Sequence, residues 1–175
     1  MKKLLTATLT AVTLSACSTT AATQYYSLPD SQFELPQGQG KEIAVQIVLA
    51  EPLNNGGLVY QTDPLSLNFA RNNLWASPLD QALAASFSNK LNRRQHSSYR
   101  YVPASRSGSS QVLKIYIEAF NGSYKGSTLV KGYAVRPNGH GKNFNIETPQ
   151  QGDGYPAMIQ SLDEGVESAA AALAD

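Results

Sequence analysis

The chain contains one cysteine, one tryptophan and two histidines in 175 residues. A single cysteine cannot pair within its own chain, so a fold held together by internal disulfide bonds is excluded. His96 and His140 have no Asp, Glu or Cys neighbour at a spacing typical of metal ligands. We therefore expect no metal site, with His96 at a helix end and His140 in a turn.

Charged residues are also scarce, at 15% of the chain against roughly 25% in average soluble proteins. The 14 bases and 13 acids give a formal net charge of +1. Cleavage after residue 16, expected for the reasons given below, removes Lys2 and Lys3 and leaves 12 bases against 13 acids, a charge of −1. This balance excludes a general electrostatic attraction to nucleic acid, so no nucleic-acid partner is expected.

The sequence lacks a recognisable catalytic constellation. Gly38-Gln39-Gly40, Gly139-His140-Gly141 and Gly152-Asp153-Gly154 are G-x-G triplets without the third glycine and the strand-to-helix context of a phosphate-binding loop. The serine-rich stretch Arg106–Ser110 has no G-x-S-x-G pattern and precedes a strand instead of following one. We expect no catalytic residue, no cofactor and no enzyme activity.

The most informative feature that is present lies at the N-terminus. Met1-Lys2-Lys3 is positively charged, and the apolar run Leu4–Leu14 is too short to span a bilayer of about 30 Å, so residues 1–16 are predicted to be a signal peptide. Leu14-Ser15-Ala16-Cys17 resembles the bacterial lipobox. That resemblance implies that Cys17 is lipidated through a diacylglycerol thioether, becomes the mature N-terminus and is N-acylated. The alternative is a chance thiol in an ordinary cleaved signal peptide.

The segment that follows Cys17 predicts a location. Ser18 stands where sorting systems of this type commonly read Asp as an inner-membrane signal, so the resemblance implies the periplasmic face of the outer membrane. Residues 17–24 form the acylated N-terminus and a short polar linker. Fully extended, Ser18–Gln24 reaches only about 25 Å, so the remaining domain, residues 25–175, is expected to work close to its membrane.

Alternation of apolar and polar residues predicts the strands, and contiguous strands joined by short turns predict a hairpin and then a three-stranded meander. The expected strands are Glu42–Leu49, Leu58–Thr62, Leu65–Ala70, Gln111–Asn121, Ser127–Val135 and Lys142–Thr148, and Tyr25–Leu28 could form a further short edge strand.

Two helices are predicted. Ser77-Pro78-Leu79-Asp80 combines an N-cap hydroxyl, a proline at the first helical position and an acid in the first turn, and this helix should end near Gln95–Ser97. Pro156 opens the second helix. The expected fold is therefore a single α/β domain, arranged in an α+β-like way, with a mixed sheet of about five to six strands and two main helices packed on it.

Charge is segregated along the chain. Between Gln81 and Ile117 there are six bases and no acid, and from Asn143 to Asp175 there are six acids and no base. One interpretation is that the two faces neutralise each other within one folded subunit or are solvated. The other is head-to-tail pairing between neighbouring subunits, which closes a ring when the rotation allows it.

Several motifs together resemble one known family. They are Leu58-Val59-Tyr60-Gln61-Thr62 followed by Asn72–Gln81, then Tyr25–Pro29, Phe120–Tyr124 and Gly152–Tyr155. This set resembles the PqiC (YmbA) family, the auxiliary lipoproteins of intermembrane transport systems. The resemblance implies an outer-membrane lipoprotein that assembles as a ring-shaped homo-oligomer and receives the tip of a tunnel-forming MCE-domain protein rooted in the inner membrane, so that lipid passes between the membranes.

The central motif supplies the candidate interface residues Tyr60, Asn73, Leu74 and Trp75. An indole just before a helix is either a core residue or an exposed partner anchor, and Tyr60 and Leu74 allow the same two interpretations. The sequence thus favours a non-enzymatic docking component that contributes to envelope integrity. The alternatives are an autonomous lipid-binding lipoprotein, which needs an apolar cavity, and a periplasmic hydrolase, which needs a carboxylate pair or a Ser/His pair.

Overall fold

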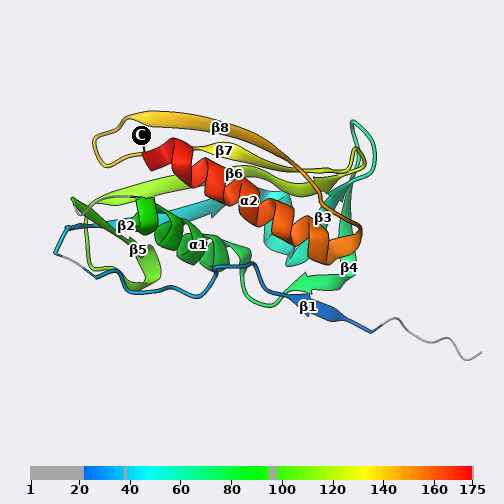
Figure 1. Ribbon diagram of the computed structural model, residues 1–175, viewed down its shortest axis with the longest axis horizontal. Coiled ribbons are helices and arrows are strands. Elements are labelled where there is room, and N and C mark those ends of the chain that lie inside the picture. The colour runs from blue at the N-terminus through cyan, green and yellow to red at the C-terminus, as the bar shows by residue number, and fades with distance from the viewer. Residues whose placement is uncertain (1–21, 38, 95–97, 175) are drawn as a thin grey trace, which may run out of the picture.

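The computed structural model describes residues 22–37, 39–94 and 98–174. The signal peptide, Cys17, Ser18 and His96 lie outside these residues. The described chain forms one eight-stranded mixed sheet, with two α-helices side by side on one of its faces (Figure 1). The predicted fold class is therefore confirmed.

The elements follow one another along the chain with short connections. The strands are β1 (Gln24–Tyr26), β2 (Lys41–Leu49), β3 (Gly57–Gln61), β4 (Leu67–Trp75), β5 (Tyr99–Pro103), β6 (Val112–Ser123), β7 (Ser127–Val135) and β8 (Gly141–Pro149). The helices are α1 (Leu79–Arg94) and α2 (Gly154–Ala174), with 3₁₀ turns η1 (Glu51–Asn55) and η2 (Ala104–Arg106).

The long strand β6 organises the sheet. Along one edge its first half pairs in parallel with β2 and its last two residues pair in parallel with β3; along the other edge it pairs with β7 in antiparallel fashion. Beyond these neighbours lie β5 next to β2, β4 and then β1 next to β3, and β8 next to β7. The predicted hairpin is β3–β4 and the predicted meander is β6–β7–β8.

The sheet has eight strands instead of the expected five or six. Strand β5 was not predicted; it is short, ends at Pro103 and forms because its five residues pair in parallel with Lys41–Val45 of β2. Strand β4 also continues to Trp75 instead of ending at Ala70, since β1 pairs with its last three residues, from Gln24 opposite Asn73 to Tyr26 opposite Trp75. Both differences come from pairing with distant segments.

The core lies between the sheet and the helices. Both helices bury their apolar residues: α1 packs against β2, β5 and α2, and α2 also packs against β6, β7 and β8. Burying one such Leu, Phe or Val contributes about 1.5–3 kcal/mol. The fully buried side chains include Leu83, Phe87 and Leu91 of α1, Leu162 and Val166 of α2, and Ile115, Ile117 and Val130 of the sheet.

Helix α1 is buried on every side from Ala82 to Leu91. Its start follows the prediction, because the carbonyl of Pro78 accepts the amide of Ala82 at 3.1 Å. The segment after β1 covers its outer surface: the Asn89 side chain accepts the amide of Glu34 at 3.0 Å and donates to the carbonyl of Gln32 at 2.7 Å. No helix within the described ranges is both long and apolar enough to cross a membrane.

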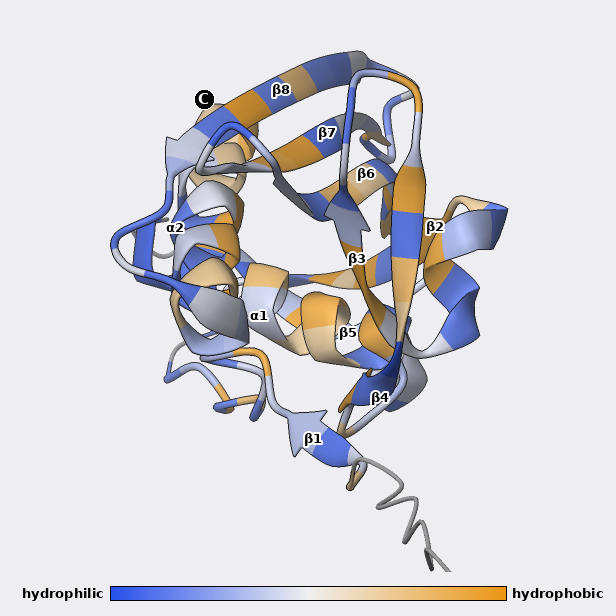
Figure 2. Ribbon diagram, turned by 90° about the vertical axis from the view of Figure 1, so that its right-hand side faces the viewer, coloured by the Kyte–Doolittle hydropathy of each residue, from blue (hydrophilic) through white to orange (hydrophobic). Residues whose placement is uncertain are grey.

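The two ends of the molecule differ. The chain enters the described structure at the end that also carries the β3–β4 turn (Thr62–Ser66), the β6–β7 turn (Tyr124–Gly126) and the start of α2, and we call it the entry end (Figures 1 and 2). The opposite end carries the β7–β8 turn (Arg136–His140) and the end of α2, where the Arg136 guanidinium donates to the carbonyl of Leu173 at 2.8 Å. His140 lies in this turn, as predicted.

Candidate functional site

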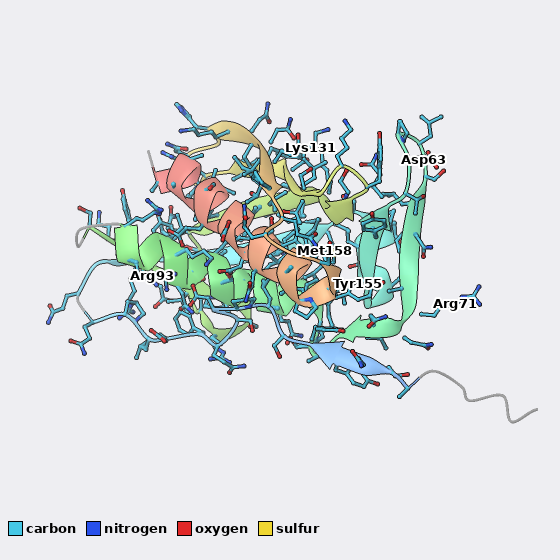
Figure 3. The ribbon with its side chains drawn as sticks, turned by 45° about the vertical axis from the view of Figure 1, so that its right-hand side comes forward. Asp63, Arg71, Arg93, Lys131, Tyr155 and Met158 are labelled. Carbon is cyan, nitrogen blue, oxygen red and sulfur yellow. The ribbon has the colours of Figure 1, made fainter. Side chains whose placement is uncertain are left out.

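A pocket of about 600 Å³ lies at the entry end, where three separate segments of the chain meet. Strand β3 contributes Tyr60, the end of β6 and the turn after it contribute Ser123, Tyr124 and Gly126, and the start of α2 with the loop before it contributes the remainder. That remainder is Gln150, Gly152, Asp153, Gly154, Tyr155 and Met158, of which Tyr155 and Met158 are labelled in Figure 3.

Glycines shape this pocket. A Cβ atom at Gly122 would stand 2.5 Å from the Met158 sulfur and 3.0 Å from the Tyr60 ring, so only glycine lets both side chains pack over β6. Gly152 and Gly154 have φ angles of +95° and +82°, which other residues rarely adopt, and these angles turn the chain from β8 into α2. The pocket floor therefore depends on glycines that belong to the motifs Phe120–Tyr124 and Gly152–Tyr155.

Hydrogen bonds hold the loop before α2 in place. The amide of Gln150 donates to the carbonyl of Gly126 at 2.9 Å, and its side-chain nitrogen donates to the carbonyl of Gly152 at 2.9 Å. The loop is thus tied both to the β6–β7 turn and to itself. A preformed wall of this kind costs little conformational entropy when a ligand or a partner binds.

Aromatic side chains gather around the pocket. The rings of Tyr26 and Tyr155 lie 5.9 Å apart, and the Tyr26 hydroxyl donates to the side chain of Asn73 at 3.2 Å. On the β6–β7 turn, the Lys125 ammonium lies 5.9 Å from the Tyr124 ring centroid. Tyrosine offers a large contact area with a polar hydroxyl group, and methionine offers a flexible apolar side chain. This composition is typical of surfaces that bind proteins or apolar ligands.

The structure separates the four predicted interface residues. Tyr60 lines the pocket, and Asn73 lies at the β1–β4 edge beneath Tyr26. Leu74 is half-buried opposite Gly57. Trp75 is only 7% exposed and its ring lies 5.9 Å from that of Phe120, so in the single subunit it is a core residue. A shared role of these four residues in an interface stays a prediction.

Tyr124, Tyr155 and Met158 line the pocket but were not among the predicted site residues. A signal for the two tyrosines was available, because they belong to the motifs Phe120–Tyr124 and Gly152–Tyr155 that support the family resemblance. Their proximity to Tyr60 was not readable from the sequence, since it depends on the parallel pairing of β3 with the end of β6.

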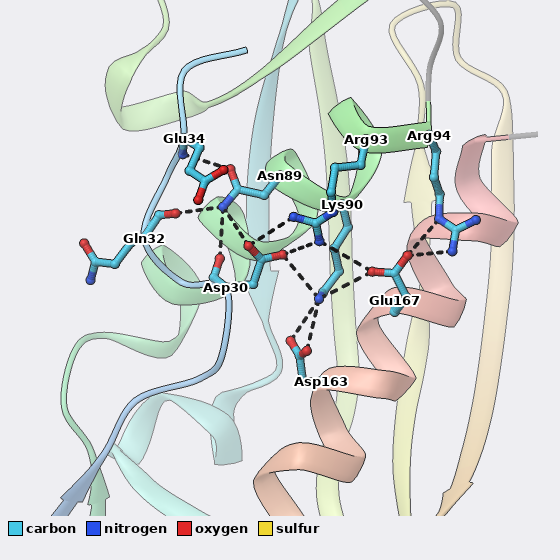
Figure 4. Close-up of polar contacts among 9 residues, drawn as sticks. All are labelled: Asp30, Gln32, Glu34, Asn89, Lys90, Arg93, Arg94, Asp163 and Glu167. Carbon is cyan, nitrogen blue, oxygen red and sulfur yellow. Dashed lines mark hydrogen bonds and ion pairs between the residues drawn. The ribbon is translucent and has the colours of Figure 1, made fainter.

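The segregated charges meet away from this pocket. The Lys90 ammonium of α1, whose side chain is 3% exposed, lies 3.0 Å from Asp163, 3.3 Å from Asp30 and 3.5 Å from Glu167 (Figure 4). Arg93 pairs with Asp30, and Arg94 pairs with Glu167. We call these residues the Lys90 cluster. The basic stretch and the acidic C-terminal stretch are thus partly neutralised within one subunit.

Burial and ion pairing oppose each other in the Lys90 cluster. For Asp163, burial dominates and raises the pKa of the carboxyl above its ordinary value despite the nearby Lys90. For Asp30, burial acts in the same direction, but hydrogen bonds from Arg93 and Asn89 together with the Lys90 charge outweigh it and lower the pKa. The cluster is a structural clasp between α1, α2 and the segment after β1.

Groups that could supply chemistry are sparse. Within the part of the chain that the structure describes, no three His, Cys, Asp or Glu side chains come close enough together to hold a metal ion. At the pocket the only carboxylate in the lining is that of Asp153. The arrangement is suited to contact with a partner surface or an apolar ligand.

Comparisons with known proteins agree on one family. The family described as the ABC-type transport auxiliary lipoprotein component matches residues 26–174. A protein of Escherichia coli (strain K12) named intermembrane transport lipoprotein PqiC is 35% identical over 172 residues, covering 93% of this chain and 90% of that protein. A Shigella flexneri protein of the same name matches to the same extent.

Solved structures share the fold. A crystal structure of an uncharacterized protein is 28% identical, with a TM-score of 0.68 over 87% of this chain and 97% of that one. A structure from Xanthomonas campestris has a TM-score of 0.65 over 86% of this chain and 92% of that one; at 13% identity it supports the fold alone.

Proposed function

Since this chain belongs to the family of ABC-type transport auxiliary lipoproteins that includes PqiC, we propose that it is a non-catalytic docking component of an intermembrane lipid transport system. It is anchored through acylated Cys17 to the periplasmic face of the outer membrane of a Gram-negative bacterium. Its partner is an MCE-domain tunnel protein of the inner membrane, and it works as a ring-shaped homo-oligomer that contributes to envelope integrity.

One observation carries the proposal. Three of the five motif segments that carry the family resemblance, Leu58–Thr62, Phe120–Tyr124 and Gly152–Tyr155, contribute residues to one pocket with an aromatic lining at the entry end. Motifs that served only packing would have no reason to gather at one surface opening. We therefore propose the pocket, with Tyr60 and Tyr155, as the contact site for the tunnel protein.

The ring is supported by family membership and not by charge. Lys90, Arg94, Asp163 and Glu167 are paired with one another inside the subunit, so they are not available for the head-to-tail pairing considered from the sequence. A subunit interface must therefore use other surfaces. Native mass spectrometry of the acylated protein in detergent gives the subunit number directly, and a monomer there would contradict the ring.

Co-purification tests the docking site. Tyr155→Asp in the full acylated chain places a charge at the pocket mouth, and we expect it to abolish capture of the MCE-domain protein from detergent-solubilised envelopes. Tyr99→Asp is the matched control, because Tyr99 is exposed at the opposite end of the molecule. A wild-type protein that captures no MCE-domain protein, or two variants with equal capture, would contradict the proposal.

A second function is favoured by the size of the same pocket. Its volume of about 600 Å³ falls within the roughly 300–1,000 Å³ typical of small-molecule sites, as an autonomous lipid-binding lipoprotein would require. Organic extraction of the purified protein followed by lipid mass spectrometry separates the two functions. A stoichiometric lipid that is lost in Tyr155→Asp, with no protein partner, would favour the lipid-binding function.

A further inference from the structure

The β3–β4 turn presents an apolar tip on a fixed backbone. The Asp63 carboxylate accepts the amides of Leu65 at 2.9 Å and Ser66 at 3.0 Å, and the amide of Thr62 donates to the carbonyl of Ser66 at 3.0 Å. These bonds close the turn without help from the rest of the fold. Leu65, at its tip, is 96% exposed. A leucine held outward on a hydrogen-bonded turn loses no packing inside its own subunit.

The neighbouring turn adds side chains that suit a lipid–water boundary. The amide of Tyr124 donates to the carbonyl of Gln61 at 2.9 Å, which places the β6–β7 turn directly beside the β3–β4 turn. Tyr124 is 42% exposed and Lys125 lies over its ring. Tyrosine and lysine are favoured at membrane interfaces, where an apolar body can be buried while the polar tip stays in the headgroup layer.

The chain toward Cys17 leaves from the same end. Strand β1 pairs in parallel with the last three residues of β4, from Gln24 opposite Asn73 to Tyr26 opposite Trp75, and lies at the lower edge of the entry end, with the β3–β4 turn at the upper edge (Figures 1 and 2). Cys17 precedes Ala22, the first described residue, by five positions, which span at most about 18 Å. An acylated Cys17 therefore holds this end close to the bilayer.

The exposed apolar side chains are unevenly distributed. Among the described residues seven large apolar side chains are exposed, and four of them come from β1, the start of β4 and the two turns of the entry end. These four are Tyr25, Leu65, Leu67 and Tyr124. Arg71, on β4 between the turn and β1, points away from the body at this end (Figure 3) and can pair with a lipid phosphate.

We propose that the entry end is a membrane-seating surface, with the β3–β4 turn inserted among the lipid headgroups of the bilayer that holds the acyl chains. The inference rests on the proposed function, because it takes Cys17 to be acylated. The acyl chains supply the membrane affinity. The turn supplies a second point of contact across the entry end, and two separated points fix how the pocket is oriented above the membrane.

A single labelled thiol tests this seating. In the acylated protein the Cys17 sulfur is a thioether, so Leu65→Cys carries the only free thiol of the chain. It is labelled with a polarity-sensitive fluorophore, and the protein is reconstituted into vesicles of phosphatidylethanolamine and phosphatidylglycerol. Asn138→Cys, in the exposed turn at the opposite end, is the matched control. Because Leu65 is so exposed, its replacement should leave folding unchanged.

We expect the label at position 65 to shift its emission to the blue on reconstitution and to be quenched by lipids that carry a nitroxide at the headgroup, while the label at 138 stays accessible to aqueous iodide. Equal accessibility at the two positions would overturn the seating. A blue shift without lipid quenching would overturn it too, because the turn would then contact a second copy or a protein partner.

Failure of the proposed function is recognised separately. Intact mass and thiol titration of the wild-type protein report on Cys17 before any labelling. A free thiol without acyl mass would contradict the lipoprotein function and remove the premise of the seating with it. An acylated Cys17 combined with a solvated label at position 65 would overturn the seating alone and leave the docking function standing.

Discussion

The Lys90 cluster and the entry end differ in whether their conspicuous side chains have partners inside the subunit. In the cluster Lys90, Arg93 and Arg94 of α1 each have an acidic partner within 3.5 Å, and Asp163 and Glu167 of α2 are among these partners. At the entry end apolar side chains remain exposed although the backbone beneath them is fully bonded. The conspicuous charge pattern is thus largely used in contacts within the subunit, whereas the tyrosines and leucines of the entry end form the surface for which we propose a partner and a membrane contact.

The largest effect is expected from breaking the helix interface itself. Phe87→Pro removes a helix hydrogen bond and a fully buried ring, at a cost of about 3 kcal/mol or more for each, and should unfold the domain. Lys125→Ala at the entry end removes only an exposed ammonium and should leave the thermal midpoint unchanged. Similar midpoints for the two variants, measured by circular dichroism, would contradict the contrast between the regions.

The next effect should come from the centre of the cluster. Lys90→Met leaves Asp163 and Asp30 without the ammonium between them and should lower the free energy of unfolding by about 3 kcal/mol. Arg94→Gln, at a pair that is more than one-third exposed on both sides, should cost less than about 1 kcal/mol. Urea titration measures both values, and a Lys90→Met variant as stable as the wild type would show that the clasp is dispensable.

A smaller effect is expected at the pocket. Gly122→Ala pushes a methyl group toward the Met158 sulfur, which is flexible enough to shift, so we expect a loss of about 1–2 kcal/mol together with weaker partner capture. Gly108→Ala is the control, because a Cβ there meets no atom within 4 Å. Equal partner capture by the two variants would remove the pocket from the docking site.

The smallest effect separates two aspartates whose pKa values are both lowered. Hydrogen bonds from the Leu65 amide and Ser66 lower the pKa of Asp63, whereas ion pairs contribute at Asp30. A lowered folded-state pKa gives stability above the unfolded value of 3.8 that is lost as the pH falls through the folded value. Asp30→Asn should therefore flatten the decline of stability below about pH 4.

The pKa values of Asp30 and Asp63 should also differ in their dependence on salt. Raising the ionic strength from about 0.05 M to 0.5 M should move the pKa of Asp30 toward its ordinary value, because part of its shift is Coulombic. The pKa of Asp63 should respond less, since its hydrogen bonds are local to the turn. Carboxyl chemical shifts followed through an acid titration measure both, and a larger salt response at Asp63 would contradict this assignment.

Local patterns predicted most elements. The alternation in Glu42–Leu49 and Gln111–Asn121 gave β2 and β6, and the Ser77–Asp80 signals gave the start of α1 within one residue. Each of these signals is contained in a few adjacent residues. Strand β5 and the last part of β4 were not predictable, because they form only where β2 and β1 offer them a partner edge.

The candidate site was predictable only in part. Tyr60 and the motif containing Tyr155 were identified from the sequence. The pocket that they share with Met158 forms only when β3 pairs with the end of β6 and α2 packs against the sheet. The burial of Trp75 was likewise not predictable from the sequence, because it depends on packing against Phe120 of the distant strand β6.

Residue type and short-range spacing are enough to predict the helices, most of the strands, the lack of internal disulfides and the motifs of the family. The tertiary structure alone decided that the opposite charges meet within one subunit, that Trp75 is enclosed, and that the tyrosines and the exposed leucines share one end. The physical reason is that burial, ion pairing and exposure are set by segments distant in the chain, whose approach is fixed by strand pairing and helix packing.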